Sequence, residues 1–303
     1  RMLTLKNSSG ILTKYLRFVD KANLKKERHQ IEGIQWCSQR ETSDVSYMKG
    51  GLIADEMGMG KTILMIGLIV CNVKKNTLVI LPKQLLLQWE KEIKKNTNHT
   101  PYMLYGSSKV KNINKDIITS SPIILTTYGT LLSLGEGSVV HKFNFDRVIV
   151  DEAHRVRNSN TKAHQNIKNL STDILWLLTG TPIQNKVQDL FRLFDLLKIP
   201  SEKYKDIKTL PDILKNYMLR REKNRDELNL PQLINKTSNI EWGSVEEMEK
   251  SKLFHQKFGD LSNNNSTLND LYYSMNTNHL VATLHARMVC ISPALLKNKS
   301  NKI

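Results

Sequence analysis

A short glycine-containing stretch ends in a lysine and a threonine, a pair that can hold a phosphate group and its metal ion. Gly58 and Gly60 let the backbone approach an anion closely, and the N–H groups of such a loop at a helix N-terminus form an anion hole. Lys61 can reach the β- and γ-phosphates of a nucleotide, and the Thr62 hydroxyl can bind Mg²⁺. The first glycine of the usual pattern is replaced by Asp55, which tolerates unusual backbone angles. The alternative is a turn whose Gly-Lys-Thr ending is accidental.

A second stretch, Val148–His154, places two neighbouring carboxylates at the end of an apolar run. Asp151 can hold the metal ion, and Glu152 can orient and deprotonate an attacking water. The alternative is that both acids cap the helix that follows. The two stretches together favour a nucleotide site over two coincidences.

A third stretch, Trp176–Asn185, reads as a strand that ends in two threonines. Gly180 and Pro182 favour a tight turn, and the hydroxyls of Thr179 and Thr181 are expected at the same edge as the acids. An ordinary turn after a strand is the alternative.

Buried strands and helices alternate around these stretches. The apolar runs that predict strands are Gly51–Ala54, Thr77–Leu81, Pro122–Thr126, Arg147–Val150 and Ile174–Leu178. Helical patterns lie between them, with apolar residues four apart in the segments 83–95 and 187–198. This alternation predicts an α/β fold, a parallel sheet with helices on both faces that binds ligands at the carboxyl ends of its strands.

The pattern changes after residue 200, where helical segments continue and strand-like runs become sparse. Ser244 and Glu247 have the spacing of a capping box at a helix start. We therefore expect an N-terminal flank over residues 1–22, an α/β lobe over residues 23–200 that carries the candidate nucleotide site, and a mostly helical C-terminal extension over residues 201–303.

The chain of 303 residues carries 45 Lys and Arg against 29 Asp and Glu, a net charge of +16. This excess suggests a polyanionic partner such as nucleic acid, although solubility or a Lys/Asn/Ile-rich composition explains it as well. Cys37, Cys71 and Cys290 lie far apart without a C-x-x-C pair, so we expect neither a zinc module nor disulfides, and a reducing compartment. No apolar run reaches the ~20 residues of a membrane span, so no membrane partner and no secretion are expected.

In this order, the stretches resemble the N-terminal RecA-like motor lobe of SWI/SNF-type remodelling ATPases, in helicase superfamily two. The resemblance covers roughly residues 23 to 296. RHQIEGIQW resembles the adenine-reading Q motif, GGLIADEMGMGKT the P-loop motif I, and TLVILPKQLLLQWEKEI and IILTTYGTL motifs Ia and Ib. VIVDEAHRVRN resembles the DEAH box and WLLTGTPIQN motif III, while MLRREKNRDELNLPQL and LHARMVCISPALL are similar to segments beyond the first lobe.

Arg40 and Glu41, ahead of motif I, resemble the repair and transcription-termination branch of the family, some members of which carry a RING finger. A viral relative of this branch fits the composition. In the family, Asp55 is the usual residue at its place in motif I.

The resemblance implies a helicase-like, ATP-binding hydrolase that uses ATP with Mg²⁺ to move along double-stranded DNA. Such proteins remodel or displace protein–DNA complexes such as nucleosomes or polymerase assemblies, in chromatin remodelling, DNA repair or transcription regulation. The expected location is the nucleus, or the nucleus or cytoplasm of a viral host. The second RecA-like lobe, which carries the family's arginine fingers, is expected outside this sequence, and this chain alone is expected to be nearly inactive.

The resemblance also assigns roles to individual residues. Lys61, Asp151 and Glu152 are the expected catalytic residues, with Thr62 and Asp151 holding the metal. The expected ATP-binding residues are Gln30, Asp55, Glu56, Met57, Gly58, Met59, Gly60, Lys61 and Thr62. His154, Thr179 and Thr181 would couple the nucleotide state to lobe movement, and Lys83, Thr126 and Thr127 would contact DNA.

Several of these roles have plain alternatives. Lys83 could equally be a solvated lysine that contacts nothing. Trp89 is expected to be a core residue on the buried face of its helix, and not to stack on a base. Arg220 and Arg221 are expected to brace the two lobes or else to end a solvated basic helix. For the whole protein, the alternatives are an RNA- or DNA-unwinding helicase and a non-catalytic DNA-binding transactivator that retains the fold.

Overall fold

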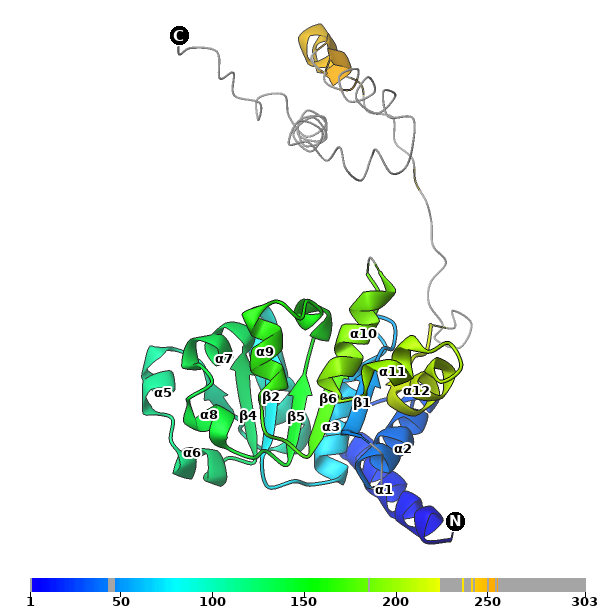
Figure 1. The fold of residues 1–303 in the computed structure, drawn as a ribbon, viewed down its shortest axis with the longest axis vertical. Helices are drawn as coiled ribbons and strands as arrows, with labels where there is room; N and C mark the ends of the chain where they lie inside the picture. Colours follow the sequence, from blue (N-terminus) through cyan, green and yellow to red (C-terminus); the bar gives the residue numbers. More distant parts are fainter. Residues whose placement is uncertain are drawn as a thin grey trace. The chain divides into compact units, whose positions relative to one another are not determined.

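A parallel β-sheet forms the centre of the N-terminal part of the chain (Figure 1). The computed structural model describes residues 2–42, 47–184 and 186–223, and then residues 236, 241, 243–249, 251–253 and 255. Within these residues, the sheet has seven strands in the order β3-β4-β2-β5-β6-β1-β7, and every neighbouring pair is parallel. All the strands therefore end at the same edge, which we call the carboxyl edge.

The strands are short and mostly buried along their whole length. They are β1 (Lys49–Ile53), β2 (Thr77–Leu81), β3 (Tyr102–Leu104), β4 (Ile123–Thr127), β5 (Arg147–Val150), β6 (Ile174–Leu178) and β7 (Met218–Leu219). The five predicted strands are confirmed as β1, β2, β4, β5 and β6, with bounds that differ by at most two residues. Strands β3 and β7 are not predicted from the sequence. They have only three and two residues, lie at the two edges of the sheet and are partly buried, so neither produces a long apolar run.

Helices cover both faces of the sheet. The α-helices are α1 (Met2–Lys21), α2 (Arg28–Thr42), α3 (Lys61–Cys71), α4 (Leu86–Thr97), α5 (Ser107–Asn112), α6 (Lys115–Ser120), α7 (Tyr128–Leu134), α8 (Val139–Lys142), α9 (Lys162–Lys168), α10 (Val187–Leu196), α11 (Ser201–Lys205) and α12 (Leu210–Tyr217). Two 3₁₀ turns, η1 (Lys83–Leu85) and η2 (Ala153–Val156), follow β2 and β5.

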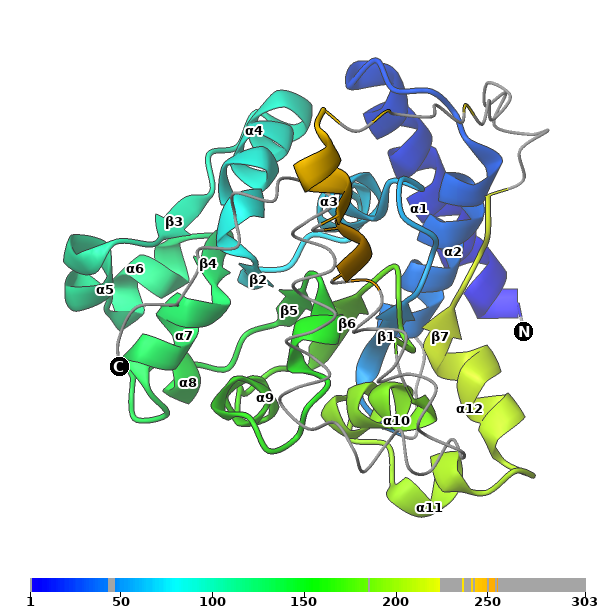
Figure 2. The same cartoon turned by 90° about the horizontal axis from the view of Figure 1, so that it is seen from above.

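Successive strand residues point to opposite faces and so enter two separate cores. Val79 and Leu81 of β2 pack with side chains of α1 to α4, whereas Leu78 and Ile80 pack in the core that includes side chains of α6 to α12. Figure 2 shows the two helical layers on either side of the sheet. Because both faces are covered, the strands are continuously apolar, which confirms the predicted RecA-like α/β fold.

The first compact unit, Arg1–Leu230, extends beyond the predicted lobe at both ends. Helix α1 packs on α2 and α3 and supplies buried side chains such as Tyr15 and Phe18. At the other end, β7 pairs with β1 and places residues 201–223 in the same unit. The predicted limits at residues 22 and 200 therefore cut through packed structure, and the functional division of the chain remains a prediction.

In the second unit, Pro231–Ile303, the structure describes a helical segment after the predicted cap. The Ser244 hydroxyl accepts a hydrogen bond from Glu247 N at 3.2 Å, and the Glu247 carboxylate accepts one from Gly243 N at 3.2 Å. These contacts agree with a capped helix start. The segment LHARMVCISPALL lies outside the described residues.

A buried ion pair joins α2 to the sheet on the α1–α4 side. Arg147 donates to both carboxylate oxygens of Glu41, at 2.7 and 2.5 Å, and both side chains are fully buried. Asn72 and Trp176 also donate to the Glu41 carboxylate, at 2.6 and 2.8 Å. Glu41 therefore has a structural role in this chain.

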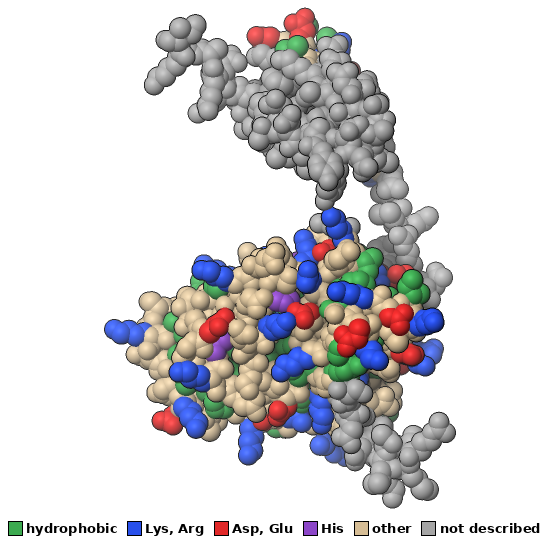
Figure 3. Space-filling model, viewed as in Figure 1, with side chains coloured by type: hydrophobic (Ala, Val, Ile, Leu, Met, Phe, Trp, Pro, Cys, Tyr) green, Lys and Arg blue, Asp and Glu red, His purple; other side chains and the backbone are tan. Residues whose placement is uncertain are grey.

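Charge is spread over the surface rather than gathered in one place on the face that Figure 3 shows. Lys and Arg side chains are scattered over the described residues there, and acidic side chains lie among them. Cys37 and Cys71 are buried and unbonded, which agrees with the expectation of no disulfide between them. Among the described helices, none is long and apolar enough to cross a membrane.

Candidate nucleotide and DNA sites

The three predicted catalytic stretches meet at the carboxyl edge. Strand β6 lies between β1 and β5, so the loop after β1, the acids after β5 and the threonines after β6 are neighbours. Thr179 N donates to Ile53 O at 3.0 Å, which holds the end of β6 against the end of β1.

The phosphate loop, residues 55–62, turns on two glycines with left-handed backbone angles. Gly58 has φ 84° and Gly60 φ 77°, conformations that favour glycine, and α3 begins at the next residue. A Cβ on Gly60 would lie 2.6 Å from Gln30 Nε2, so a larger residue would require the Gln30 side chain to move. Gln30 donates to Met59 O at 2.5 Å and Gly60 O at 3.2 Å and so holds the loop from α2.

Lys61 lies across the loop. Its Nζ donates to Asp55 O at 2.8 Å and Glu56 O at 3.3 Å. Burial lowers the pKa of Lys61, while the nearby carboxylates of Asp55, Glu152 and Asp151 oppose this shift. A phosphate group bound at the loop would offer Lys61 a charged acceptor in place of backbone carbonyls.

The remaining side chains of the loop differ in what they contact. Met57 is exposed and lies against Gly180, where a Cβ would be 2.8 Å from Met57 Cγ, whereas Met59 is buried. Thr62, in the first turn of α3, is half-buried and makes no recorded hydrogen bond to a residue that the structure describes. Its hydroxyl is therefore available at the place predicted for a metal ligand.

Asp55 does not point its carboxylate at the loop, and the predicted ATP contact by this side chain is corrected. Asp55 is 1% exposed and accepts hydrogen bonds from Arg221 N, Nε and Nη2, the first two at 3.1 and 3.0 Å. Its φ is not positive, so an unusual backbone angle is not the reason for aspartate here. Asp55 is needed because it binds Arg221.

The segment 219–223 runs beside the loop as a continuation of β7. Ala54 N donates to Leu219 O and Glu56 N to Arg221 O, and the Glu56 carboxylate accepts from Lys223 N at 2.8 Å. The guanidinium of Arg221 also donates to His29 O. Arg221 therefore uses its guanidinium inside the first unit to fasten α2 to the phosphate loop, and its expected role between two lobes stays a prediction.

Asp151 is held by two aromatic side chains. Trp89 Nε1 of α4 donates to Asp151 Oδ2 at 2.8 Å, and the Tyr128 hydroxyl donates to Asp151 O at 2.5 Å. Burial raises the pKa of Asp151, and the hydrogen bond from Trp89 is the main contact that opposes this shift. Trp89 is 1% exposed, which confirms the predicted core position, but its indole also orients the predicted metal ligand.

Glu152 has an uncommon backbone conformation and a carboxylate that contacts His154. Its φ of 53° and ψ of 47° are left-handed, and its Oε2 is buried without a hydrogen-bond partner among the described residues. The same oxygen lies 3.1 Å from His154 Nδ1, and this nitrogen lies 3.3 Å from the Thr179 hydroxyl. His154 therefore links the acids after β5 to the end of β6.

Burial lowers the pKa of His154, and Arg157 and Arg155 add to this effect, while the charge of Glu152 opposes it. The imidazole can therefore pass a change at Glu152 to Thr179 without carrying a charge itself. Thr181 lies beside Thr179, whose hydroxyl accepts from Thr181 N at 3.2 Å.

The site fits a nucleotide with its metal ion. Gln30 Oε1 is a buried acceptor without a hydrogen-bond partner among the described residues, and Glu152 Oε2 has only its 3.1 Å contact with His154 Nδ1. No group of three or more His, Cys, Asp or Glu side chains within the described ranges forms a complete metal site. Phosphate oxygens and water would therefore complete the shell around an ion held by Thr62 and Asp151, as is usual for Mg²⁺.

A second concavity lies along the same edge, beyond the ends of β2, β3 and β4. We call it the β2–β4 groove; it encloses about 520 Å³ and is lined by Lys83, Thr127, Tyr128 and Arg155 among others. Lys83 Nζ lies 5.7 Å above the ring of Tyr105, and a hydrogen bond to Tyr105 raises the pKa of Lys83. The groove thus presents two cations next to backbone and hydroxyl groups at helix starts.

The two threonines predicted to contact DNA differ. Thr126 is fully buried and its hydroxyl donates to Leu104 O at 3.0 Å, so its predicted DNA contact is corrected. Thr127 lines the β2–β4 groove, and its hydroxyl caps α7 by accepting from Thr130 N at 3.1 Å. Successive side chains of β4 point to opposite faces of the sheet. Thr127, the last residue of β4, is the one of the two threonines that lies at the carboxyl edge.

Three residues near these sites have no role predicted from the sequence: Arg155, Tyr128 and Lys223. The contact of Arg221 with Asp55 is not predicted either. Arg155 follows the DEAH box directly, so its proximity could have been inferred from the strand that precedes it. The contacts of Tyr128 and Arg221 span 23 and 166 positions of the chain and leave no local signal.

Comparisons with known proteins agree with this geometry. The SNF2-related domain family matches residues 29–295. The chain is 33% identical to DNA repair protein RAD5 of Candida albicans over 189 residues, covering 51% of this chain and 17% of the relative. It is 28% identical to DNA repair protein rad8 of Schizosaccharomyces pombe over 311 residues, covering 84% of this chain and 27% of the relative. The chain thus spans less than a third of the length of these relatives.

Among solved structures, the SWI2/SNF2 ATPase core of Sulfolobus solfataricus in complex with dsDNA has a similar fold. The TM-score is 0.57 at 25% identity, and the match covers 91% of this chain and 60% of that one. Together with the family match over most of the chain, this shows that the protein belongs to the SNF2-related family of helicase superfamily two and carries the helicase-like, ATP-binding lobe of a SWI/SNF-type ATPase.

Proposed function

We propose that the chain is the first motor lobe of an ATP-dependent double-stranded-DNA translocase that remodels or displaces protein–DNA complexes. The observation that carries the proposal is the carboxyl edge itself, where the nucleotide site at β1, β5 and β6 adjoins the β2–β4 groove. A duplex phosphate backbone bound in the groove would contact Lys83 and Arg155 without any base being read. This suits a motor that must run over any sequence. A nuclear location goes with this substrate.

In this proposal, the phosphate loop and Lys61 bind the phosphates of ATP, Gln30 contacts the adenine, and Thr62 and Asp151 hold Mg²⁺. The bound metal ion would neutralise charge that develops on the phosphates. Glu152 accepts the proton of the attacking water on its carboxylate, which His154 contacts at 3.1 Å. The contact of His154 with Thr179 then transmits the state of the nucleotide to the end of β6.

Contact between the two sites supports coupling of DNA binding to hydrolysis. Tyr128 lines the β2–β4 groove and donates to Asp151 O. Trp89 lies on α4, which starts just after Lys83, and donates to the Asp151 carboxylate. DNA that shifts either element would change the position of the metal ligand.

Steady-state ATPase measurements on the full-length protein, with and without duplex DNA, test the proposal. We expect stimulation by duplex DNA and a loss of at least about 100-fold in Lys61→Ala and Glu152→Gln. Lys83→Ala should raise the DNA concentration needed for half-stimulation and leave the DNA-free rate unchanged. Lys91→Ala, an exposed lysine of α4 outside the groove, serves as the matched control. A full-length protein whose ATPase ignores duplex DNA would contradict the proposal.

The proposal includes a requirement for the second RecA-like lobe, because the family's arginine fingers contribute about 10³–10⁵ in rate in related phosphoryl transfer. Strong DNA-stimulated ATPase activity of the isolated 303-residue chain would refute this part.

The two alternatives predict other outcomes. An RNA-unwinding helicase would be stimulated by single-stranded RNA more than by duplex DNA. A non-catalytic transactivator would keep its biological activity in the Lys61→Ala variant.

A further inference from the structure

A second pocket lies away from the nucleotide site, and we call it the α1 pocket. It encloses about 360 Å³ between α1, the end of α3, the end of α4 and the start of β4. Its residue Ile123 opens β4, so the pocket lies toward the edge where β4 begins, opposite the carboxyl edge. Neither the proposed ATP site nor the β2–β4 groove shares a lining residue with it.

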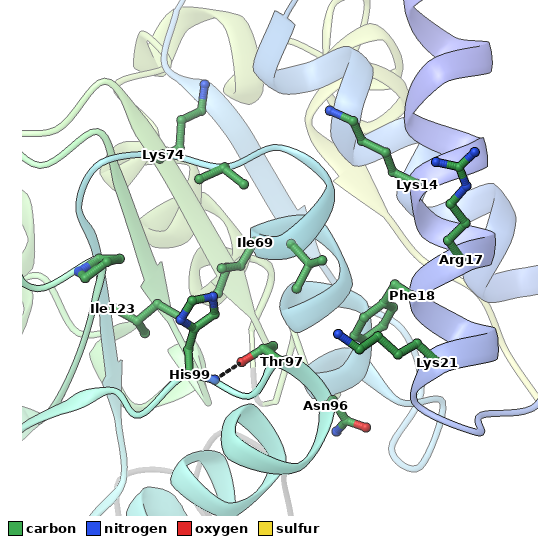
Figure 4. Close-up of a pocket in the computed structure, with 13 residues that line it drawn as sticks. Lys14, Arg17, Phe18, Lys21, Ile69, Lys74, Asn96, Thr97, His99 and Ile123 are labelled. Atoms are coloured by element: carbon green, nitrogen blue, oxygen red, sulfur yellow. Dashed lines mark hydrogen bonds between the residues drawn. The ribbon is translucent and has the colours of Figure 1, made fainter.

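The rim of the α1 pocket is basic. Lys14, Arg17 and Lys21 are spaced by three and four positions and so lie along one side of α1, while Lys74 lies on the other side of the opening (Figure 4). These four cations make no salt bridge to any carboxylate among the residues that the structure describes, and no Asp or Glu lines the pocket. Such a rim attracts carboxylates.

The floor of the pocket is apolar. Phe18 and Ile69 face the opening between the basic side chains in Figure 4, and Ile123 lies beside them. Val73 adds an exposed apolar side chain, with 76% of its surface accessible. A DNA backbone has no group that would fill an apolar floor, whereas a bulky aliphatic or aromatic side chain does.

From the basic rim and the apolar floor together we propose that the α1 pocket binds an acidic peptide segment of a partner protein, because such a segment complements both in charge and in hydrophobicity. The peptide's apolar side chains would lie on Phe18, Ile69 and Val73, and its carboxylates would pair with Lys14, Arg17, Lys21 and Lys74. The proposal does not depend on the motor function, because the pocket shares no residue with that site.

Fluorescence anisotropy with the full chain and a labelled synthetic helical peptide of Glu, Leu and Phe tests the proposal. We expect saturable binding that is weakened at least about 10-fold by the combined change Lys14→Glu, Arg17→Glu and Lys21→Glu. The same charge change at three exposed lysines elsewhere, Lys91→Glu, Lys111→Glu and Lys115→Glu, should weaken binding less than about 3-fold. Thermal unfolding checks that both triple variants are folded.

A second variant and two peptides separate the apolar from the ionic contribution. Val73→Asp should weaken binding without loss of thermal stability, because Val73 is largely exposed. Peptides with Gln for Glu, or Ser for Leu and Phe, should each bind at least about 10-fold more weakly.

Three results would overturn the proposal. The first is absence of peptide binding at millimolar concentration, and the second is equal weakening by the two triple variants. The third is a pocket triple variant that loses affinity for a short DNA duplex while the peptide does not bind, which would identify a nucleic-acid contact instead.

Discussion

Single residues in this chain often act through a backbone or side-chain partner far away in sequence. Asp55 stands where many phosphate loops have glycine, and its carboxylate is used entirely by Arg221. Arg221 in turn reaches His29 O on α2. The aspartate is thus part of the frame that shapes the loop, and not a defect in the loop.

We predict that Arg221→Ala lowers the free energy of unfolding by about 3 kcal/mol, since it leaves the buried Asp55 carboxylate without its ion pair. It should also weaken ATP binding, because the loop loses a support. Arg220→Ala is the matched control: Arg220 is more exposed, pairs with exposed Glu222 and donates one hydrogen bond to Ala54 O at 3.1 Å, so its loss should cost only about 1 kcal/mol. Urea denaturation measures both, and equal losses would contradict the assignment.

Trp89→Phe should change the response to Mg²⁺ and to pH. The indole hydrogen bond keeps the pKa of Asp151 from rising further, so its removal makes a proton a better competitor for the metal ion. In the full-length protein, the acid limb of the ATPase profile should move to higher pH, and half-maximal activity should need more Mg²⁺. Trp36→Phe, which makes the same change away from Asp151, should leave both curves in place.

At the scale of elements, side chains connect the ends of neighbouring strands, and no local sequence pattern predicts these contacts. His154 follows β5 and contacts Thr179 at the end of β6, while Tyr128 and Trp89 reach Asp151 from α7 and α4. The carboxyl edge therefore behaves as one connected surface, on which DNA and nucleotide are both proposed to bind.

The half-buried His154 should make stability depend on pH with a defined sign. Because burial lowers its pKa in the folded chain below the ordinary value of 6.5, the unfolded chain binds more protons in that window. Stability contributed by neutral His154 is present above pH 6.5 and is lost as the pH falls below it. We expect His154→Asn to reduce the loss of stability between about pH 7.5 and about pH 5.5.

Guanidinium denaturation at the two pH values measures this difference. Thr179→Val removes the hydroxyl partner but leaves the imidazole, so it should keep the pH dependence. If the pH dependence of stability were unchanged in His154→Asn, groups other than His154 would cause it.

At the scale of the whole unit, the Glu41–Arg147 pair ties α2 to the sheet through a fully buried contact. Glu41→Gln leaves the Arg147 charge buried without a carboxylate and should cost about 3–5 kcal/mol. Adding Arg147→Met removes that charge, so the double variant should be more stable than Glu41→Gln alone. Urea denaturation measures both, and a double variant that is less stable than Glu41→Gln would contradict the view that the unpaired charge of Arg147 causes the loss.

The fold class and the identity of the nucleotide site followed from local patterns. Apolar runs bounded by polar residues predicted the five main strands, because strands covered on both faces are apolar throughout. Gly58, Gly60, Lys61, Thr62, Asp151 and Glu152 could be assigned because their chemistry depends on residue type and on a position at a strand end. Both kinds of information are present in short stretches of chain.

Contacts between distant segments were decided only by the tertiary structure. Thr126 and Thr127 are adjacent in sequence, yet Thr126 is buried and bonded to the neighbouring strand β3, whereas Thr127 lines a groove. Successive side chains point to opposite faces of a sheet, and the sequence does not specify which strand pairs with β4. Arg221 could be placed against Asp55 only once β7 had paired with β1. The α1 pocket likewise exists only because α1 packs beside α3, which no local pattern specifies.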